Sequence, residues 1–469
     1  MRIILPIIGC ILALLTAIFV FNTIPHVQDS IAQLFQARIF LKGRLYAQSH
    51  PLKQFFDYTH MINNGRWYSQ YPPGHPMLLA IGLLAGAPLV INPILAAIGI
   101  FITMLIARER FSERTSILTG IFMILSPFYI FMAGSHMSHV SGMLFLIIFF
   151  FAMFKERYIL AGIGLGIAFL IRPFTAFLYA IPVLLLIRPK RILPLLFSFT
   201  PFVILLLLYN HLTNGDPFTF GYTVLHGKNV GLGFGKSAWG MPHTLSRGLN
   251  DAWDNIKELS SNLFEWPIPS VIPFLLPVFF FKKKYLIFYL IPISLLVGHI
   301  FYWYHDLCLG PRFLYESLPL IVILSAVGID LLIKKIRRSY PIYAVLTGLF
   351  IFSVAVRVPY LITRASPGNA LPYGRSFWGV DPYLGQLARS SGIKNGIVFV
   401  DMQYPRQKFD PYLWFGSAFL HNTPDLGTDV IYARHLSMED TLLMNYYPQR
   451  SYYLYQGYLR KGRLLRLER

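Results

Sequence analysis

The chain has 469 residues, of which 55% are hydrophobic and only 13% are charged. A soluble protein of this length would expose far more charge, so the composition indicates a membrane protein. The formal net charge of +20 raises the question of nucleic-acid binding. The basic residues, however, stand in short clusters between apolar runs, which is the positive-inside pattern of membrane proteins, and we expect no nucleic-acid partner. The clusters are Arg108, Arg110 and Arg114; Lys155 and Arg157; Arg188, Lys190 and Arg191; Lys282, Lys283 and Lys284; and Lys334, Lys335, Arg337 and Arg338.

The apolar runs predict about eleven spans, by the criterion of roughly 20 residues per crossing. The run 77–107 contains Pro88 and Pro93, so it is either one kinked helix or a span with an interfacial segment. Taken as a single crossing, it places every basic cluster on one side, which predicts a cytoplasmic N-terminus and an external C-terminus for a multi-pass protein of the inner membrane. The expected spans are 3–21, 77–107, 115–132, 137–154, 159–172, 174–188, 192–209, 268–281, 285–303, 313–333 and 341–358.

The large loops all fall on the predicted external side. They are 22–76, 210–267 and the tail 359–469, whereas the cytoplasmic loops are short and basic. The predicted fold is therefore an all-α polytopic membrane domain over 1–360 with a small external α/β domain over 361–469. Chemistry is expected on the external face, where soluble nucleotide sugars are absent. No Walker or GxGxxG motif occurs, which argues against a nucleotide-driven pump.

Local patterns place elements in these loops. Apolar residues at near-helical spacing predict a helix over 30–42, ended by Gly43 and lying on the membrane interface. A second amphipathic helix is predicted over 249–265, after a glycine-rich segment. In the tail, apolar alternation predicts strands over 396–401, 430–434 and 451–455 and a helix over 438–447.

Asp29 is the leading candidate for a catalytic group. It follows the first predicted span by a few residues and precedes the predicted helix of the first loop. A carboxylate can take the proton of an acceptor hydroxyl or amine without a metal. The alternative is that Asp29 only caps the following helix, a position that favours aspartate. Position alone leaves both interpretations open.

Two arginines are candidates for binding a phosphate. Arg172 and Arg312 lie at the predicted external ends of apolar runs, where a guanidinium suits a lipid phosphate or pyrophosphate. The alternative for each is snorkelling to lipid headgroups. Glu316 follows Arg312 by about one helical turn, which predicts an ion pair between these two side chains.

Further polar residues near the same face are candidates for substrate binding. They include four histidine or carboxylate positions whose spacing is not diagnostic of a metal site, so no metal is assigned and a bound divalent cation stays an open alternative. The two cysteines, Cys10 and Cys308, form no metal-binding motif. The substrate-binding candidates are His26, Tyr71, His75, His139 and Asp306.

These motifs resemble a known family. An acid after the first span, a helical first loop and the sequence Tyr-Pro-Pro-Gly-His-Pro at 71–76 are similar to the GT-C membrane glycosyltransferases. Within that fold, the chain most resembles the bacterial branch related to protein O-mannosyltransferases and the lipid A aminoarabinose transferase. Met-Ser-His-Val at 137–140, Ile-Ala-Phe-Leu-Ile-Arg-Pro at 167–173 and Gly-Pro-Arg-Phe-Leu-Tyr-Glu at 310–316 also resemble segments of that branch, so the resemblance covers about residues 1–360.

The resemblance implies a sugar donor attached to a polyprenyl phosphate and transfer on the external face, normally with inversion. It implies that Asp29 is the catalytic acid of the first loop, although Ser30 stands where family members often carry a second acid. The expected partners are the polyprenyl-phosphate-linked sugar and membrane lipids, with the acceptor, a lipid, glycan or protein, left open. Two alternatives also remain open: a glycan polymerase or ligase using pyrophosphate-linked donors, and a transporter or flippase of lipid-linked sugars.

Overall fold

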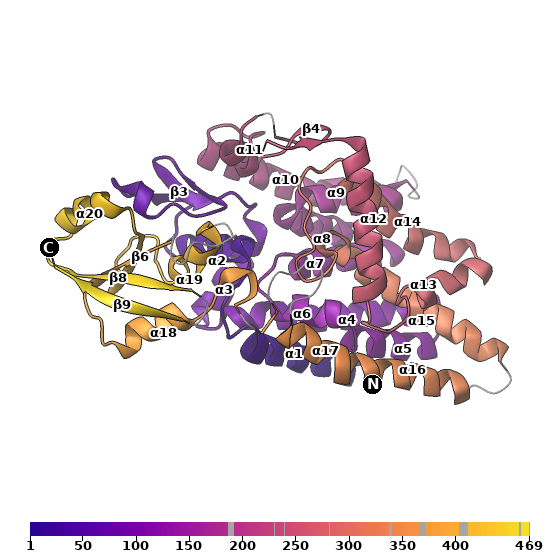
Figure 1. The fold of residues 1–469 in the computed structure, drawn as a ribbon. Helices are drawn as coiled ribbons and strands as arrows, with labels where there is room; N and C mark the ends of the chain where they lie inside the picture. Colours follow the sequence, from indigo (N-terminus) through magenta and orange to yellow (C-terminus); the bar gives the residue numbers. More distant parts are fainter. Residues whose placement is uncertain are drawn as a thin grey trace.

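A computed structural model of the chain describes residues 1–185, 192–228, 230–238, 240–280, 282–336, 340–364, 372–374, 376–402, 411–458 and 461–468. Figure 1 shows a bundle of helices with a smaller β-containing unit at one end, where the C-terminus lies. The mixed sheet of the tail thus stands apart from most of the apolar helices. This division matches the predicted all-α membrane part with an α/β region at the C-terminus.

The bundle consists of apolar helices, several of them long enough to cross a membrane. In the described part of the chain, four reach this length: Pro88–Arg110, Ile192–Asn214, Arg312–Lys335 and Tyr340–Thr363. The protein is therefore a multi-pass membrane protein, while the count of eleven spans stays a prediction. The helices are α1 (Ile4–Leu15), α3 (Gly74–Leu84), α4 (Ile91–Arg110), α5 (Glu113–Ile124), α6 (Pro127–Gly134), α7 (His139–Phe154), α8 (Tyr158–Ile171), α9 (Pro173–Leu184), α10 (Ile192–Asn214), α13 (Ile272–Leu275), α14 (Leu286–His299), α15 (Leu318–Lys335), α16 (Tyr340–Phe352) and α17 (Val358–Thr363).

Prolines break two of the predicted spans. The run 77–107 is not one kinked helix, because α3 ends at Leu84 and α4 begins after a 3₁₀ turn over Pro88–Val90. Helices α5 and α6 meet at an angle of 58°. There Ser126 caps α6 by accepting a hydrogen bond from the backbone of Tyr129, and Pro127 occupies the first helical position, where its missing N–H costs nothing.

The loop side of the bundle carries the remaining elements. In the first loop, α2 (Gln28–Leu41) precedes a small antiparallel sheet of β1 (Ala47–Gln48), β2 (Met61–Asn63) and β3 (Arg66–Ser69), in the order β1-β3-β2. The second large loop contains α11 (Gly221–His226), the short pair β4 (Gly235–Lys236) and β5 (Pro242–His243), and α12 (Leu245–Asn262). Helix α12 matches the predicted amphipathic helix, although it begins and ends earlier, and it runs across the bundle helices in Figure 1.

The tail forms a four-stranded sheet in the order β7-β6-β8-β9. Strands β6 (Gly396–Val400), β7 (Val430–Arg434) and β8 (Ser451–Tyr458) are parallel and lie at the predicted positions, with Ile397 opposite Ile431 and Tyr452. The edge strand β9 (Lys461–Leu467) pairs antiparallel with β8 and was not predicted, because its charges hide the apolar alternation. Helices α18 (Tyr383–Ser390), α19 (Pro411–Phe419) and α20 (Asp440–Tyr446) accompany the sheet.

Helix α2 and the tail share one hydrophobic core. The ring of Phe35 on α2 lies 4.5 Å from that of Trp67 and 5.1 Å from that of Phe419 on α19. A glycine permits this approach, because a Cβ at Gly416 would lie 3.1 Å from the Ile31 side chain. Ten of the 14 residues of α2 are buried by protein, on all sides of the helix, so the expectation that it lies on the membrane interface is wrong.

Arg38 connects α2 to the end of α19. Its guanidinium donates to the backbone carbonyls of Leu420 and Asn422, at 2.7 and 2.8 Å. We expect Arg38→Met to lower the stability of this contact by about 2 kcal/mol, because two charge-assisted hydrogen bonds are lost. Hydrogen exchange should then show faster exchange in residues 415–422, whereas Arg44→Met, at an exposed position, should leave exchange unchanged. Equal exchange in both variants would contradict the role of Arg38.

Candidate functional site

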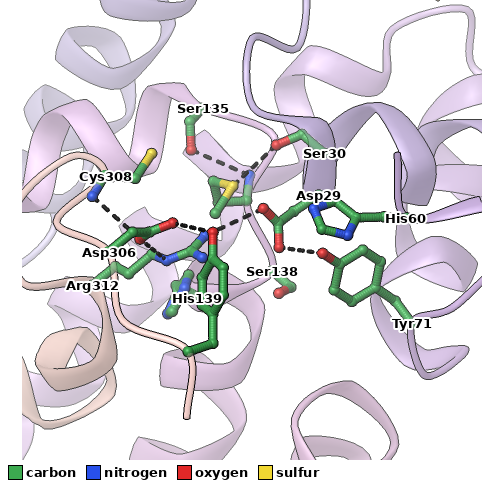
Figure 2. Close-up of polar contacts among 12 residues, drawn as sticks. Asp29, Ser30, His60, Tyr71, Ser135, Ser138, His139, Asp306, Cys308 and Arg312 are labelled. Carbon is green, nitrogen blue, oxygen red and sulfur yellow. Dashed lines mark hydrogen bonds and ion pairs between the residues drawn. The ribbon is translucent and has the colours of Figure 1, made fainter. Parts of the chain in front are cut away.

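Asp29 lies in the first turn of α2 and does not cap it. The residue at the cap position is Val27, and no side chain forms a capping hydrogen bond there. The two carboxylate oxygens of Asp29 instead face partners from distant parts of the chain (Figure 2). Tyr71 donates a hydrogen bond to Oδ1, and Nη1 of Arg312 lies 3.4 Å from Oδ2. The capping interpretation is therefore wrong, and the carboxylate is available for other chemistry.

Arg312 is held between two carboxylates. Besides Asp29, its Nε lies 2.6 Å from Oδ1 of Asp306, whose other oxygen accepts a hydrogen bond of 2.7 Å from the Tyr304 hydroxyl. Arg312 opens a 3₁₀ turn at the head of α15 and is only 3% exposed. A guanidinium buried to this degree does not snorkel to headgroups, and its stability there depends on the two acids.

These charges set the protonation of the site. Burial by itself would raise the pKa of Asp29, but the Arg312 charge, supported by His60 and by the hydrogen bond from Tyr71, lowers it to about 2. Burial and the negative charge of Asp29 raise the pKa of Tyr71 well above its ordinary value. At neutral pH the site therefore contains an ionised carboxylate that accepts a hydrogen bond from a neutral phenol.

The lowered pKa of Asp29 predicts how stability depends on pH. Its ordinary value is 3.8, so the ionised carboxylate stabilises the fold fully above that pH, and this contribution is lost as pH falls through about 2. We expect the stability difference between the wild type and Asp29→Asn in detergent to change by about 2 kcal/mol between pH 5 and pH 2. A constant difference over this range would show that folding does not lower the pKa of Asp29.

A second buried ion cluster surrounds Arg172, at the junction of α8 and α9. Its Nε lies 3.0 Å from Oε1 of Glu316, and Nδ1 of His139 lies 3.0 Å from the same oxygen. The side chains of Glu316 and His139 are fully buried. The predicted pair of Glu316 with Arg312 is thus wrong. Residues 312–317 form a 3₁₀ helix with about three residues per turn, so positions four apart do not share a face.

A cavity of about 470 Å³ lies beside both ion clusters. Tyr71, the partner of Asp29, and Arg172 both line it, so one residue of each cluster contributes to its wall. The ring of Tyr222 also lines it and packs against that of Tyr71 at 5.6 Å. Most other walls are apolar or aromatic, contributed by α8, α9, α11 and residues 299–303. The volume and lining are typical of a small-molecule site with a few orienting polar groups.

Four of the five predicted substrate-binding residues do not line this cavity. The two ring nitrogens of His26 lie 2.8 Å from the Phe21 carbonyl and 3.2 Å from the Phe377 carbonyl, so His26 connects the first loop to the tail. His75 bonds to the Ser141 hydroxyl at 2.9 Å and to the His136 carbonyl at 3.0 Å. Of the other candidates, Tyr71 lines the cavity, Asp306 binds Arg312, and His139 lies behind Arg172. Their roles toward substrate remain predictions.

Ser30, which stands where members of the family often carry a second acid, is directed toward the helix bundle. Ser30 is 1% exposed, donates a hydrogen bond of 3.1 Å to the sulfur of Met137 and does not line the cavity.

In the described part of the chain, no group of three or more histidine, cysteine, aspartate or glutamate side chains is arranged to hold a metal ion. The guanidinium of Arg312 occupies the space between the carboxylates of Asp29 and Asp306, so these residues do not fit a metal, and no step is derived through one.

Sequence reasoning missed several residues of the site. His60 lies beside the Asp29 carboxylate in Figure 2, and its ring packs on Tyr71 at 5.7 Å. Tyr222 and Tyr304 also approach the cluster, as described above. None of these residues stands in a recognisable motif. His60 has a positive φ of 65°, a strained backbone that places its ring inward but leaves no signal in the sequence.

The bundle and its loop-side unit define the GT-C fold of membrane glycosyltransferases. Neither family models nor curated proteins match the sequence itself. The structure is similar to that of ArnT, the lipid A aminoarabinose transferase, from Cupriavidus metallidurans bound to undecaprenyl phosphate, with a TM-score of 0.54, 12% identity and coverage of 96% of this chain and 92% of that one. The apo state of ArnT gives the same TM-score and identity, over 95% of this chain and 92% of that one.

A more distant similarity joins the chain to the oligosaccharyltransferase of Archaeoglobus fulgidus. The TM-score is 0.41 and the identity 12%, over 76% of this chain and 54% of that one. The ArnT match covers nearly the whole of both chains, so it includes the tail as well as the bundle. The fold expected from the motifs of the first loop is thereby confirmed.

Proposed function

We propose that the protein is a glycosyltransferase that moves a sugar from a polyprenyl-phosphate-linked donor to an acceptor on the external face of the membrane. The observation that carries the proposal is the ionised Asp29, which is held by Arg312 and by Tyr71, and Tyr71 lines a largely apolar cavity. The GT-C fold and the undecaprenyl phosphate bound to ArnT support it. In this proposal the cavity receives the first isoprene units, and Arg172 binds the phosphate.

The reaction assigns a role to each charge. Asp29 accepts a hydrogen bond from the acceptor hydroxyl or amine and takes its proton as the new bond to the anomeric carbon forms. The bond between that carbon and the phosphate oxygen breaks, and its electron pair leaves with the polyprenyl phosphate, which gains one negative charge. Arg172 and Arg312 stabilise this charge as it develops. Attack opposite the leaving phosphate inverts the anomeric configuration.

In this proposal, donor binding also raises the pKa of Asp29, the general base. A carboxylate with a pKa of about 2 is a weak proton acceptor while Arg312 is its main partner. A phosphate near Arg312 offsets part of the guanidinium charge, so the pKa of Asp29 rises when the donor is bound. Tyr71, which keeps its proton, orients the carboxylate throughout. The base thus becomes effective only when the leaving group is in place.

The lipid carrier that the reaction releases from the donor can be measured even though the acceptor is not identified, so it tests the proposed function. We expect the full chain in proteoliposomes, given membrane extract and a panel of sugars on undecaprenyl phosphate, to release undecaprenyl phosphate. Release of undecaprenyl pyrophosphate from pyrophosphate-linked glycans alone would support the polymerase or ligase instead. Movement of intact lipid-linked sugar across the bilayer without bond cleavage would identify a transporter or flippase. Either result would overturn the proposal.

A further inference from the structure

Two buried glutamines stand one turn apart on α2 and differ in how their amides are satisfied. Gln36 is fully buried, its Nε2 donates to the Leu45 carbonyl at 2.8 Å, and its Oε1 accepts from the Ser69 backbone N–H at 3.0 Å. Gln33 is 3% exposed, and its amide forms no hydrogen bond within the described part of the chain. The amide of Gln36 therefore holds the first loop together, whereas that of Gln33 has no such role.

Gln33 lines the 470 Å³ cavity. Its Oε1 is enclosed by protein, so Nε2 is the polar atom of this side chain that can reach the cavity. An amide N–H that is removed from water without a partner is costly, so this position favours a ligand that accepts a hydrogen bond. Because an amide nitrogen only donates, the ligand group must be an acceptor.

Helix α2 packs so that Gln33 approaches the head of α7. Gln33 follows Asp29 by four positions, so the two side chains lie on one face of α2. On the same part of the helix, Ser30 donates a hydrogen bond of 3.1 Å to the sulfur of Met137. Met137 directly precedes Ser138, which also lines the cavity. The walls contributed by Gln33 and Ser138 are therefore neighbours.

Arg172 adds a cation to this part of the cavity wall. Its Nη1 donates to Oγ of Ser138 at 3.4 Å, and 20% of its side chain is exposed. Ser138 accepts that hydrogen bond, so it can still donate its own hydroxyl proton to a ligand. Glu316 is fully buried and balances the charge of Arg172. The wall thus offers an amide, a hydroxyl and a guanidinium as donors, and no carboxylate is among the described residues that line the cavity.

A phosphate group matches this set of donors. Its non-bridging oxygens accept several hydrogen bonds at once, and hydrogen bonds to a charged acceptor are the stronger ones. A sugar hydroxyl carries a proton that needs an acceptor of its own, which these three donors do not supply while Ser138 and Arg172 are paired. The chemistry of the wall therefore favours the phosphate of a lipid-linked substrate over its sugar.

We propose that Gln33 binds the phosphate of the donor, with Nε2 donating to a non-bridging oxygen beside Arg172 and Ser138. This inference rests on the proposed function, in which Arg172 binds that phosphate. The helix that carries the general base then also holds the leaving group, because Asp29 and Gln33 are one turn apart. The hydrogen bond from Gln33 strengthens as the departing phosphate gains charge, and it fixes the position of the breaking bond relative to Asp29.

Binding of undecaprenyl phosphate to the full chain in nanodiscs tests this contact, with native mass spectrometry as the readout. We expect Gln33→Leu, which keeps the volume and removes the donor, to weaken binding by about tenfold or more. Gln33→Glu should weaken it further, because a carboxylate repels the phosphate. Undecaprenol, which lacks the phosphate, should bind the wild type and Gln33→Leu equally. The unfolding midpoint of Gln33→Leu should not fall, because no internal hydrogen bond is lost.

Gln36→Leu is the matched control, because it removes an amide of the same helix that forms two internal hydrogen bonds and does not line the cavity. It should lower the unfolding midpoint and leave undecaprenyl phosphate binding by the folded protein unchanged. Wild-type binding by Gln33→Leu, an equal loss with undecaprenol, or an equal loss in Gln36→Leu would overturn the phosphate contact. A wild type that fails to bind undecaprenyl phosphate would instead count against the proposed function. The two ideas therefore fail separately.

Discussion

Asp29→Asn is expected to lower the rate of sugar transfer by about 10²–10⁴-fold and to leave the protein folded. The amide keeps the size of the carboxylate and can still accept the hydrogen bond from Tyr71, but it cannot take a proton from the acceptor. The measurement is the rate of undecaprenyl phosphate release in proteoliposomes, together with the unfolding midpoint in detergent. Binding of undecaprenyl phosphate should change little, because the cavity and Arg172 are intact.

A matched carboxylate provides the control. Asp425 also has a pKa lowered to about 2, here by the hydrogen bond from Lys42, but it is half exposed and lies on the surface of the tail. Asp425→Asn should transfer sugar at the wild-type rate. If Asp29→Asn turned over like the wild type, Asp29 would not be the base. If both variants lost activity equally, the loss would reflect the stability of the loop-side unit instead.

Arg312→Gln should have the largest combined effect, lowering transfer by about 10²–10⁴-fold and stability by about 3–5 kcal/mol. Its removal leaves Asp29 and Asp306 buried together without their shared cation. Arg312→Lys should also fail, because one ammonium cannot reproduce the planar guanidinium that reaches both carboxylates. The measurements are undecaprenyl phosphate release, undecaprenyl phosphate binding and the unfolding midpoint.

Two further variants distinguish the loss of stability caused by unpaired buried charges from the loss of the transfer rate. Adding Asp306→Asn to Arg312→Gln removes one uncompensated charge, so stability should recover in part while transfer stays low. Arg114→Gln is the control for losing an arginine, because Asp330 keeps its ion pair with Lys334 at 2.5 Å. It should retain both stability and activity. An active Arg312→Gln, or a double variant with full activity, would remove Arg312 from the mechanism.

Hydrophobic runs and loop sizes predicted much of the architecture. The apolar helices, helix α2 with Gly43 at its end, and the three parallel strands of the tail all depend on local periodicity, which the sequence records directly. The same is true of the candidate acid and arginines, because an ionisable side chain at the edge of an apolar run is costly and therefore informative. Strand β9 escaped prediction because its edge position permits charged residues.

Contacts between distant segments could not be predicted in this way. The sequence by itself determined that Asp29, Arg172 and Arg312 lie at the ends of apolar segments, because burying charge in lipid is costly wherever the chain folds. Only the tertiary structure decided that Arg312 bridges Asp29 and Asp306, that Glu316 pairs with Arg172, and that His60 approaches the carboxylate. Such pairings depend on side-chain direction across helices far apart in the chain. The sequence pattern does not record that direction, because the two side chains of each pair come within hydrogen-bonding distance only after the helices have packed together.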